Sequence, residues 1–230
     1  MKYKSVAIDG PSGAGKSTLA KRLAKELGFI YVDTGAIYRT LGLFALSRGV
    51  SPSDEEQVKE LLPSVSIYMD YGPDGLQHMY LGGKPELGGV DVTDRIRTPE
   101  VSDAASKVSA LPMVRDFLMD MQRGMAQNYS VVMDGRDIGT VVLPHAEVKI
   151  FLTASPEERA RRRCAELQER GTSIAYETVL SDIMERDSRD SGRSAAPLKQ
   201  AEDAILVDTT GISLEESFQL LLQTVRENLA

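Results

Sequence analysis

A glycine-rich string near the start of the chain restricts the fold more than any other feature of the sequence. Residues 10–17 read GPSGAGKS and match the pattern G-x-x-x-x-G-K-[ST] in full. An apolar run, Val6–Asp9, precedes the string, and a helical pattern, Lys16–Leu27, follows it. A strand, a glycine loop and a helix in this order form a phosphate-binding loop (P-loop), in which backbone N–H groups and the helix N-terminus surround an anion. The alternative is a glycine-rich turn with a chance lysine, and the flanking strand and helix argue against it.

The rest of the chain alternates short apolar runs with helical patterns. The runs are nearly continuous in apolar residues, which is typical of strands buried on both faces of a parallel sheet. The predicted strands are Val6–Asp9, Phe29–Asp33, Val131–Asp134, Val148–Thr153 and Ala204–Asp208. Further helices are predicted over Ala36–Arg48, Pro112–Gln127 and Tyr176–Arg189, and Ser-x-x-Glu capping boxes mark helix starts at Ser53/Glu56, Ser155/Glu158 and Ser213/Glu216. Such alternation predicts an open α/β sheet with right-handed crossovers.

One stretch, Val65–Val92, interrupts the alternation. It contains six glycines and two prolines, one of them Pro73, with short strand-like segments such as Ser66–Met69 and Gln77–Leu81 between them. Clusters of turn residues around short strands are typical of antiparallel hairpins. We therefore expect a small antiparallel meander inserted into the main fold.

Composition excludes several classes of protein. The 230 residues are 42% hydrophobic and 27% charged, as in an ordinary globular domain, and the net charge of −7 argues against general nucleic-acid binding. A single cysteine, Cys164, excludes a disulfide framework and a cysteine-based zinc site, and the two histidines, His78 and His145, are too few for a histidine-rich metal site. No run of about 18 apolar residues occurs, so we expect no membrane span and a cytoplasmic location.

The P-loop pattern assigns roles to its polar residues. Lys16 supplies a charge for the β- and γ-phosphates, Ser17 offers a hydroxyl to Mg²⁺, and Thr18 can add a phosphate contact. The strand that ends at Asp134 places a carboxylate near the metal, where it can act through a water. The alternative for Asp134 is a residue that caps a turn.

Arginines gather in one part of the chain. Eight of the 17 lie within residues 159–193, together with seven acidic residues. They are Arg159, Arg161, Arg162, Arg163, Arg170, Arg186, Arg189 and Arg193. Phosphoryl transfer between two anionic nucleotides needs several cations, and arginine binds phosphate in a bidentate way. The cluster is therefore compatible with a mobile lid, and the alternative is an exposed, salt-bridged helix pair.

A second polar string, DTGAIYR, follows the predicted strand Phe29–Asp33. The hydroxyl of Thr34 and the guanidinium of Arg39, one helical turn later, could hold the phosphate of an acceptor. The alternative is a plain strand-to-helix connection in which Thr34 caps the helix.

Taken together, these strings resemble the bacterial-type cytidylate kinases, of the nucleoside monophosphate kinase group. The resemblance spans essentially the whole chain. It is carried by IDGPSGAGKST (Ile8–Thr18), DTGAIYR (Asp33–Arg39), IRTPEVSDAAS (Ile96–Ser106), DGRDIGTVV (Asp134–Val142), KIFLTASPEERA (Lys149–Ala160) and ERDSRDSGR (Glu185–Arg193). It implies a P-loop NTPase fold: a five-stranded parallel sheet flanked by helices, a three-stranded antiparallel insert in the monophosphate-binding part, and a short helical lid.

The resemblance also implies the parts of the single domain. The core comprises residues 1–35, 128–157 and 200–230, the monophosphate-binding part residues 36–127, and the lid residues 158–193. Thr34 stands where many family members have serine, and the loop 82–89 looks longer than the family pattern.

Roles for individual residues follow from the same resemblance. ATP phosphates would bind to Gly10, Pro11, Ser12, Gly13, Ala14, Gly15, Lys16, Ser17 and Thr18. The acceptor, CMP or dCMP, would meet Thr34, Arg39, Ser106, Arg115, Asp137, Arg186, Asp190 and Arg193. The residues expected to act at the transferring group are Lys16, Arg136, Arg159, Arg163 and Arg186.

The expected activity is Mg²⁺-dependent transfer of the ATP γ-phosphoryl group to CMP or dCMP, by a monomer that binds neither nucleic acid nor a membrane. A kinase for UMP or another small acceptor would use the same machinery. A nucleotide-dependent switch would bind nucleotide and form no CDP, and RNA binding through the arginines would depend steeply on salt. For Ser106 and Arg115, a helix-surface pair is the alternative.

Overall fold

The computed structural model describes residues 3–72, 75–169 and 171–229. Pro73 and Arg170, which the sequence analysis uses, lie outside these residues. The chain divides into two compact units: unit 1 comprises Met1–Ile30 and Asn128–Ala230, and unit 2 comprises Tyr31–Gln127. The P-loop string lies in unit 1, and the predicted meander lies in unit 2.

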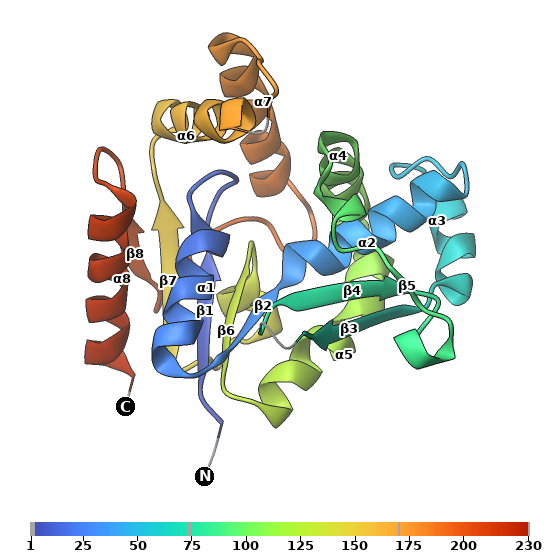
Figure 1. The fold of residues 1–230 in the computed structure, drawn as a ribbon, viewed down its shortest axis with the longest axis horizontal. Helices are drawn as coiled ribbons and strands as arrows, with labels where there is room; N and C mark the ends of the chain where they lie inside the picture. The colour runs from blue at the N-terminus through green and yellow to red at the C-terminus, as the bar shows by residue number, and fades with distance from the viewer. Residues whose placement is uncertain (1–2, 73–74, 170, 230) are drawn as a thin grey trace. The chain divides into compact units, whose positions relative to one another are not determined.

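The main sheet has five strands in the order β2-β6-β1-β7-β8 (Figure 1); four of them belong to unit 1, and all of β2 except Ile30 belongs to unit 2. The strands are β1 (Ser5–Asp9), β2 (Ile30–Asp33), β6 (Val131–Gly135), β7 (Val148–Thr153) and β8 (Ile205–Asp208). β1 pairs in parallel with β6 and β7, and β7 pairs in parallel with β8. β2 enters the sheet at Ile30, whose N–H donates to the Ser130 carbonyl at 2.9 Å. The predicted five-stranded parallel sheet is confirmed, and every predicted strand agrees to within one residue at each end.

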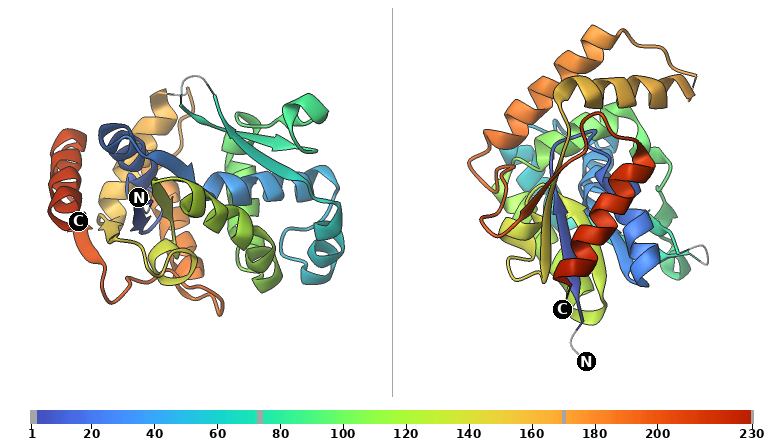
Figure 2. Two further views of the ribbon diagram at one scale, coloured as in Figure 1. Left: turned by 90° about the horizontal axis from the view of Figure 1, so that it is seen from below. Right: turned by 90° about the vertical axis from the view of Figure 1, so that its left-hand side faces the viewer.

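Four α-helices flank this sheet: α1 (Lys16–Leu27), α6 (Pro156–Glu169), α7 (Tyr176–Ser191) and α8 (Leu214–Asn228). α1 and α8 pack together through buried leucines and through two ion pairs of 2.7 Å, Arg22–Glu215 and Arg226–Glu26. Figure 2 shows α8 running alongside the sheet. α6 and α7 lie beyond the carboxyl end of β7 (Figure 1) and share a small apolar core of Ala160, Leu167, Val179 and Ile183.

The three predicted capping boxes have different outcomes. Ser213/Glu216 forms a complete box at α8. At α6, Ser155 Oγ accepts the Glu158 N–H at 3.2 Å, but the Ser155 N–H donates to Thr210 Oγ1, so only half the box forms. The predicted box at Ser53/Glu56 is wrong. Asp54 caps α3 instead, and its carboxylate accepts the Gln57 N–H at 3.0 Å. A carboxylate is a stronger acceptor than the hydroxyl of Ser53.

Unit 2 combines helices with a separate small sheet. Its helices are α2 (Thr34–Ser47), α3 (Glu55–Leu61), α4 (Pro99–Val108) and α5 (Pro112–Asn128), with short 3₁₀ turns at Leu62–Ser64, Pro85–Leu87 and Arg95–Arg97. The sheet is formed by β3 (Ile67–Tyr71), β4 (Gln77–Leu81) and β5 (Val90–Asp91), all antiparallel. The predicted three-stranded meander is therefore confirmed.

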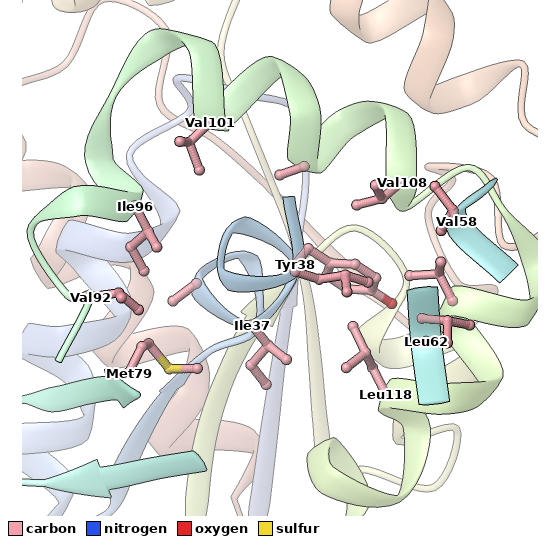
Figure 3. Close-up of a cluster of buried hydrophobic side chains, with 14 residues drawn as sticks. Ile37, Tyr38, Val58, Leu62, Met79, Val92, Ile96, Val101, Val108 and Leu118 are labelled. Atoms are coloured by element: carbon pink, nitrogen blue, oxygen red, sulfur yellow. The ribbon is translucent and has the colours of Figure 1, made fainter. Parts of the chain in front are cut away.

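The core of unit 2 is centred on α2. Ile37 and Leu41 are fully buried and lie among apolar side chains from α3, α4, α5 and the small sheet (Figure 3). Gly42 lets α4 approach closely, because a Cβ at this position would lie 3.0 Å from the Ala105 backbone nitrogen. Within the described residues of both units, every helix is too short or too polar to cross a membrane.

Candidate active site

The P-loop follows β1 and depends on glycine at two positions. Gly10 has φ +151°, and a Cβ there would lie 1.9 Å from the carbonyl oxygen of Leu152 in β7. Gly15 has φ +84° and forms the N-cap of α1. These backbone conformations are costly for any other residue, and they leave the loop open to an anion at the helix N-terminus.

Lys16, the lysine of this loop, is buried, and its Nζ donates to the Pro11 carbonyl at 2.7 Å. Burial, together with the nearby charge of Arg136, lowers the pKa of the Lys16 ammonium well below its usual value. An incoming phosphate would add negative charge and favour the protonated lysine.

Ser17 and Asp134 lie together, as the sequence analysis expected. Ser17 Oγ donates to Asp134 Oδ2 at 2.9 Å, and the Asp134 side chain is almost fully buried at the end of β6. A hydroxyl and a carboxylate are hard oxygen ligands of the kind that hold Mg²⁺ together with substrate phosphates. These two residues therefore fit the metal that accompanies a nucleoside triphosphate.

A buried ion network continues from the end of β6. Arg136 Nε donates to Asp190 Oδ2 at 2.9 Å, and Arg193 Nη2 lies 2.7 Å from Asp190 Oδ1. Burial alone would raise the pKa of Asp190, but the positive charges of Arg136, Arg193 and Arg186 outweigh it and hold that pKa below its usual value. Asp190 thus stays ionised and keeps guanidinium groups close to Lys16, whose environment also includes Arg136 and Arg186.

Arg159 ties α6 to the P-loop. It donates to the carbonyls of Ser12 and Ala154, both at 2.9 Å, and forms a 2.6 Å ion pair with Asp187 of α7. Arg163, in contrast, pairs with Glu166 on its own helix at 2.8 Å. In this arrangement Arg159 holds the first turn of α6 against the P-loop, and Arg163 lies along the side of α6.

A cleft of about 430 Å³ lies beside the P-loop at the carboxyl ends of β7 and β8. Open α/β sheets bind ligands at this edge. Its lining includes Pro11 of the P-loop, Arg159 and Asp187, with Ser155, Asp208 and Thr210.

In unit 2, Asp33 organises the beginning of α2. Its carboxylate caps the helix through the Ala36 N–H at 2.8 Å and accepts from Arg39 at 2.8 Å and Arg97 at 3.1 Å. Burial alone would raise the pKa of Asp33, but the two guanidinium groups and the cap outweigh it and lower the pKa. The Gln77 side chain pairs with the Asp33 backbone, so β4 fixes this corner too. Asp33 is therefore the N-cap, and Thr34 is the first residue of α2.

The other predicted residues of unit 2 are buried. Ser106 lies on α4 and Arg115 on α5, each 4% exposed. Arg115 donates to the Ser109 carbonyl at 3.0 Å and stacks over the Tyr38 ring at 5.5 Å. Neither is a surface residue, so the alternative of a helix-surface pair is wrong for both.

The predicted site residues are thus distributed over the two units. Unit 2 holds Thr34, Arg39, Ser106 and Arg115. Unit 1 holds the P-loop, Asp134, Arg136, Asp137, Arg159, Arg163, Arg186, Asp190 and Arg193.

Four residues with central contacts in the two units have no role predicted from the sequence: Asp9, Asp33, Arg97 and Asp187. Asp9 and Asp33 end strands, as Asp134 ends the predicted strand Val131–Asp134, and the carboxyl edge of the sheet was a usable signal for them. Arg97 and Asp187 act through contacts distant in sequence or between helices, and periodicity carries no information about such contacts.

The chain is similar to known proteins along nearly its whole length. The family model described as cytidylate kinase matches residues 6–227. The cytidylate kinase of Carboxydothermus hydrogenoformans is 51% identical over 220 residues, which cover 96% of this chain and 96% of that protein. This chain belongs to the cytidylate kinase family. The resemblance drawn from the sequence strings is thereby confirmed.

Other relatives show the same family. The cytidylate kinase of Caldicellulosiruptor bescii is 49% identical over 223 residues, covering 97% of this chain and 96% of that protein. Among solved structures, an uncharacterized protein from Eubacterium ventriosum matches with a TM-score of 0.52 and 12% identity, over 97% of this chain and 98% of that one. This last likeness shows the fold alone.

Proposed function

We propose that this enzyme transfers the γ-phosphoryl group of ATP to CMP or dCMP, forming ADP and CDP or dCDP. The observation that carries the proposal is the buried arrangement of Lys16, Arg136 and Asp190 beside the P-loop, in a chain of the cytidylate kinase family. Cations held in place around a transferring phosphoryl group offset its charge in the transition state.

The P-loop is the donor site in this proposal. Residues Gly10 to Thr18 would surround the ATP phosphates with backbone N–H groups, and Lys16 would reach the β- and γ-phosphates. Ser17 and Asp134 would hold Mg²⁺, which neutralises charge on the donor phosphates when bound. Their 2.9 Å contact supports a joint role.

The acceptor side follows the family resemblance. Arg39 would bind the CMP phosphate, next to Thr34. Asp137 and Ser106 would accept from the exocyclic amine of cytosine, and Arg115 would donate to N3 and O2. Uracil presents a carbonyl at the position of that amine, so the Asp137 carboxylate would face an acceptor instead of a donor, and a site built on hydrogen bonds rejects such an analogue.

The remaining arginines would act near the sugar and the transferring group. Arg186, Asp190 and Arg193 would hold the ribose and phosphate, and Arg136, Arg159 and Arg163 would contact phosphates during transfer. Residues 158–193 form a lid in this proposal. The shared apolar core of α6 and α7 supports their movement as one body.

No general base is needed for the reaction. The CMP phosphate already carries an anionic oxygen at neutral pH, and this oxygen attacks the γ-phosphorus in line with the departing ADP. The residues of this chain therefore contribute positioning and charge neutralisation.

We further infer a monomer that acts in the cytoplasm. Half-burial of the single cysteine, Cys164, against α6 and α7 is in keeping with a reducing compartment, where thiols pack as small apolar groups. Size-exclusion chromatography with light scattering tests the monomer: a mass near 25.1 kDa is expected, and twice that mass would contradict it.

The direct test is a coupled ADP-release assay with Mg²⁺–ATP against CMP, dCMP, UMP, AMP and GMP. We expect strong turnover with CMP and dCMP only. Equal turnover with UMP would contradict the roles of Ser106, Arg115 and Asp137 and leave the kinase intact. ATP binding without turnover of any acceptor would overturn the proposed function in favour of a switch.

A further inference from the structure

Asp9 is a buried carboxylate for which the proposed mechanism has no use. It ends β1 directly before the P-loop and is 5% exposed. Its two oxygens accept different backbone N–H groups, Oδ1 from Ile138 and Oδ2 from Gly139, both at 2.7 Å. Both donors belong to the π-helical turn Ile138–Val142, which follows Asp137.

These two hydrogen bonds, which we call the Asp9 clamp, act on the peptide group that joins Asp137 to Ile138. The N–H of that peptide donates to Asp9, and its carbonyl accepts the N–H groups of Val141 at 2.9 Å and Val142 at 3.2 Å. Both ends of one rigid plane are therefore held, which sets the ψ angle of Asp137. Asp137 has φ −143° and ψ 25°, values of neither a helix nor a strand, so regular secondary structure does not impose this conformation.

The opposite side of the turn is closed by Lys149 of β7. A Cβ at Gly139 would lie 3.2 Å from Lys149 Cδ and 3.4 Å from Asp9 Oδ2, so Gly139 sits between these two side chains. Lys149 is itself anchored, because its Nζ donates to the Pro144 carbonyl at 2.6 Å and to both oxygens of Asp203. The turn therefore has little room to shift while Asp9 is ionised.

We propose that Asp9 is the positioning residue for Asp137: by holding the Asp137–Ile138 peptide plane, it directs the Asp137 carboxylate toward the base and so sets the choice of CMP over UMP. This inference rests on the proposed function, because it takes Asp137 as the reader of cytosine. Asp9 itself touches no substrate in this account.

Asp9→Asn is the first test. The amide keeps one acceptor but presents an NH₂ group to a backbone N–H, so the turn must move. We expect the CMP-to-UMP ratio of kcat/KM to fall about 10-fold, mainly through KM for CMP. KM for ATP should change far less. An equal loss with CMP and UMP would indicate a merely structural role and overturn the proposal.

Glu147→Gln is the matched control. The Glu147 carboxylate also accepts a backbone N–H of β1 at 2.7 Å, that of Ser5, but at the opposite end of the strand from Asp9. The substitution therefore acts at the amino end of β1, so the CMP-to-UMP ratio should stay at the wild-type value. A fall matching that of Asp9→Asn would overturn the proposal.

A double-mutant cycle with Asp137→Asn separates this inference from the proposed function. If Asp9 acts through Asp137, Asp9→Asn should leave the ratio unchanged in the Asp137→Asn background. An undiminished effect there would overturn the positioning role. If Asp137→Asn alone leaves the ratio unchanged, the proposed role of Asp137 in reading the base is wrong. If Asp137→Asn changes the ratio and Asp9→Asn does not, the proposed base reading stands and only the positioning role of Asp9 is overturned.

Two further readouts remain if Asp9→Asn does not fold. Gly139→Ala should lower the ratio too, because its methyl group would press on Lys149 and Asp9. In the wild type, the CMP-to-UMP ratio should fall as pH drops from 7.5 to 5.5, because protonation of the Asp9 carboxylate weakens its hold on the two backbone N–H groups. CMP and UMP carry the same phosphate, so its titration cancels in the ratio. The charged groups that face Asp9 include Asp137, Lys16 and, across Gly139, Lys149. A ratio unchanged in both experiments would overturn the proposal.

Discussion

Three buried aspartates in this protein differ in what compensates their charge. Asp33 and Asp190 each face guanidinium groups, which hold their pKa values below the usual range in spite of burial. Asp9 is surrounded instead by backbone N–H groups and by the like charge of Asp137, and burial raises its pKa to about 6. The aspartate side chain is thus stabilised as an anion at Asp33 and Asp190, and it is costly to ionise at Asp9.

This difference predicts how Asp9 affects stability. The folded protein binds the Asp9 proton up to a pH of about 6, whereas the unfolded chain releases it near 3.8. Stability from Asp9 is therefore present at low pH and falls as pH rises between these values, by at most about 3 kcal/mol. Urea unfolding of the wild type and Asp9→Asn from pH 4.5 to 7.5 measures this. The wild type should gain stability over the variant as pH falls, and parallel profiles would contradict the expectation.

At the scale of elements, the packing of α2 against α4 depends on glycine, which has no side chain, at position 42. A Cβ at Gly42 would lie 3.0 Å from the Ala105 nitrogen and 3.2 Å from the Ala104 carbonyl carbon, and backbone atoms cannot move aside as a flexible side chain can. Because α4 carries Ser106, the separation of these two helices also decides where that hydroxyl lies.

Gly42→Ala should therefore destabilise the protein by about 1–3 kcal/mol, since overpacking outweighs the gain in helix propensity. It should also raise KM for CMP more than KM for ATP. Gly124→Ala in α5 is the matched control, because a Cβ there meets nothing within 4 Å. It should stabilise the helix by about 0.5–1 kcal/mol. Thermal unfolding and steady-state kinetics check both variants, and an equally stable Gly42→Ala protein would contradict the account.

Elements were predictable from the sequence to different degrees. The strands and the helix Lys16–Leu27 could be predicted because apolar runs and a P-loop are local signals, and Val148–Thr153 was predicted without error. The cap of α3 was assigned to Ser53 instead of Asp54, since two neighbouring cap residues cannot be told apart by pattern. The clamp of Asp9 on Ile138 joins residues 129 apart in sequence, and no periodicity reports such a contact.

At the scale of the whole molecule, three arginines of the proposed site are already paired with carboxylates. Arg159 is paired with Asp187, and Arg136 and Arg193 are paired with Asp190. Full charge stabilisation of a transferring phosphoryl group therefore requires the acceptor, whose phosphate competes for these guanidinium groups. Lid closure over both substrates would exclude water from the same site.

ATP hydrolysis without CMP should accordingly be slower than phosphoryl transfer by about 100-fold or more. Phosphate release from Mg²⁺–ATP, with and without CMP, measures the difference. An Asp187→Asn variant, which removes the carboxylate paired with Arg159, should raise the CMP-independent rate relative to the wild type. A wild-type ATPase rate comparable to the kinase rate would contradict this expectation.

The division of the chain has a consequence for its synthesis on the ribosome. Unit 2 is one continuous segment, Tyr31–Gln127, whereas unit 1 is assembled from both ends of the chain. Chains fold as they emerge, so unit 2 can complete its core before β6 has been translated. β1 and the P-loop, although made before unit 2, must wait for β6 and β7 before they have a strand to pair with. We therefore expect the P-loop to become functional only after unit 2 has folded.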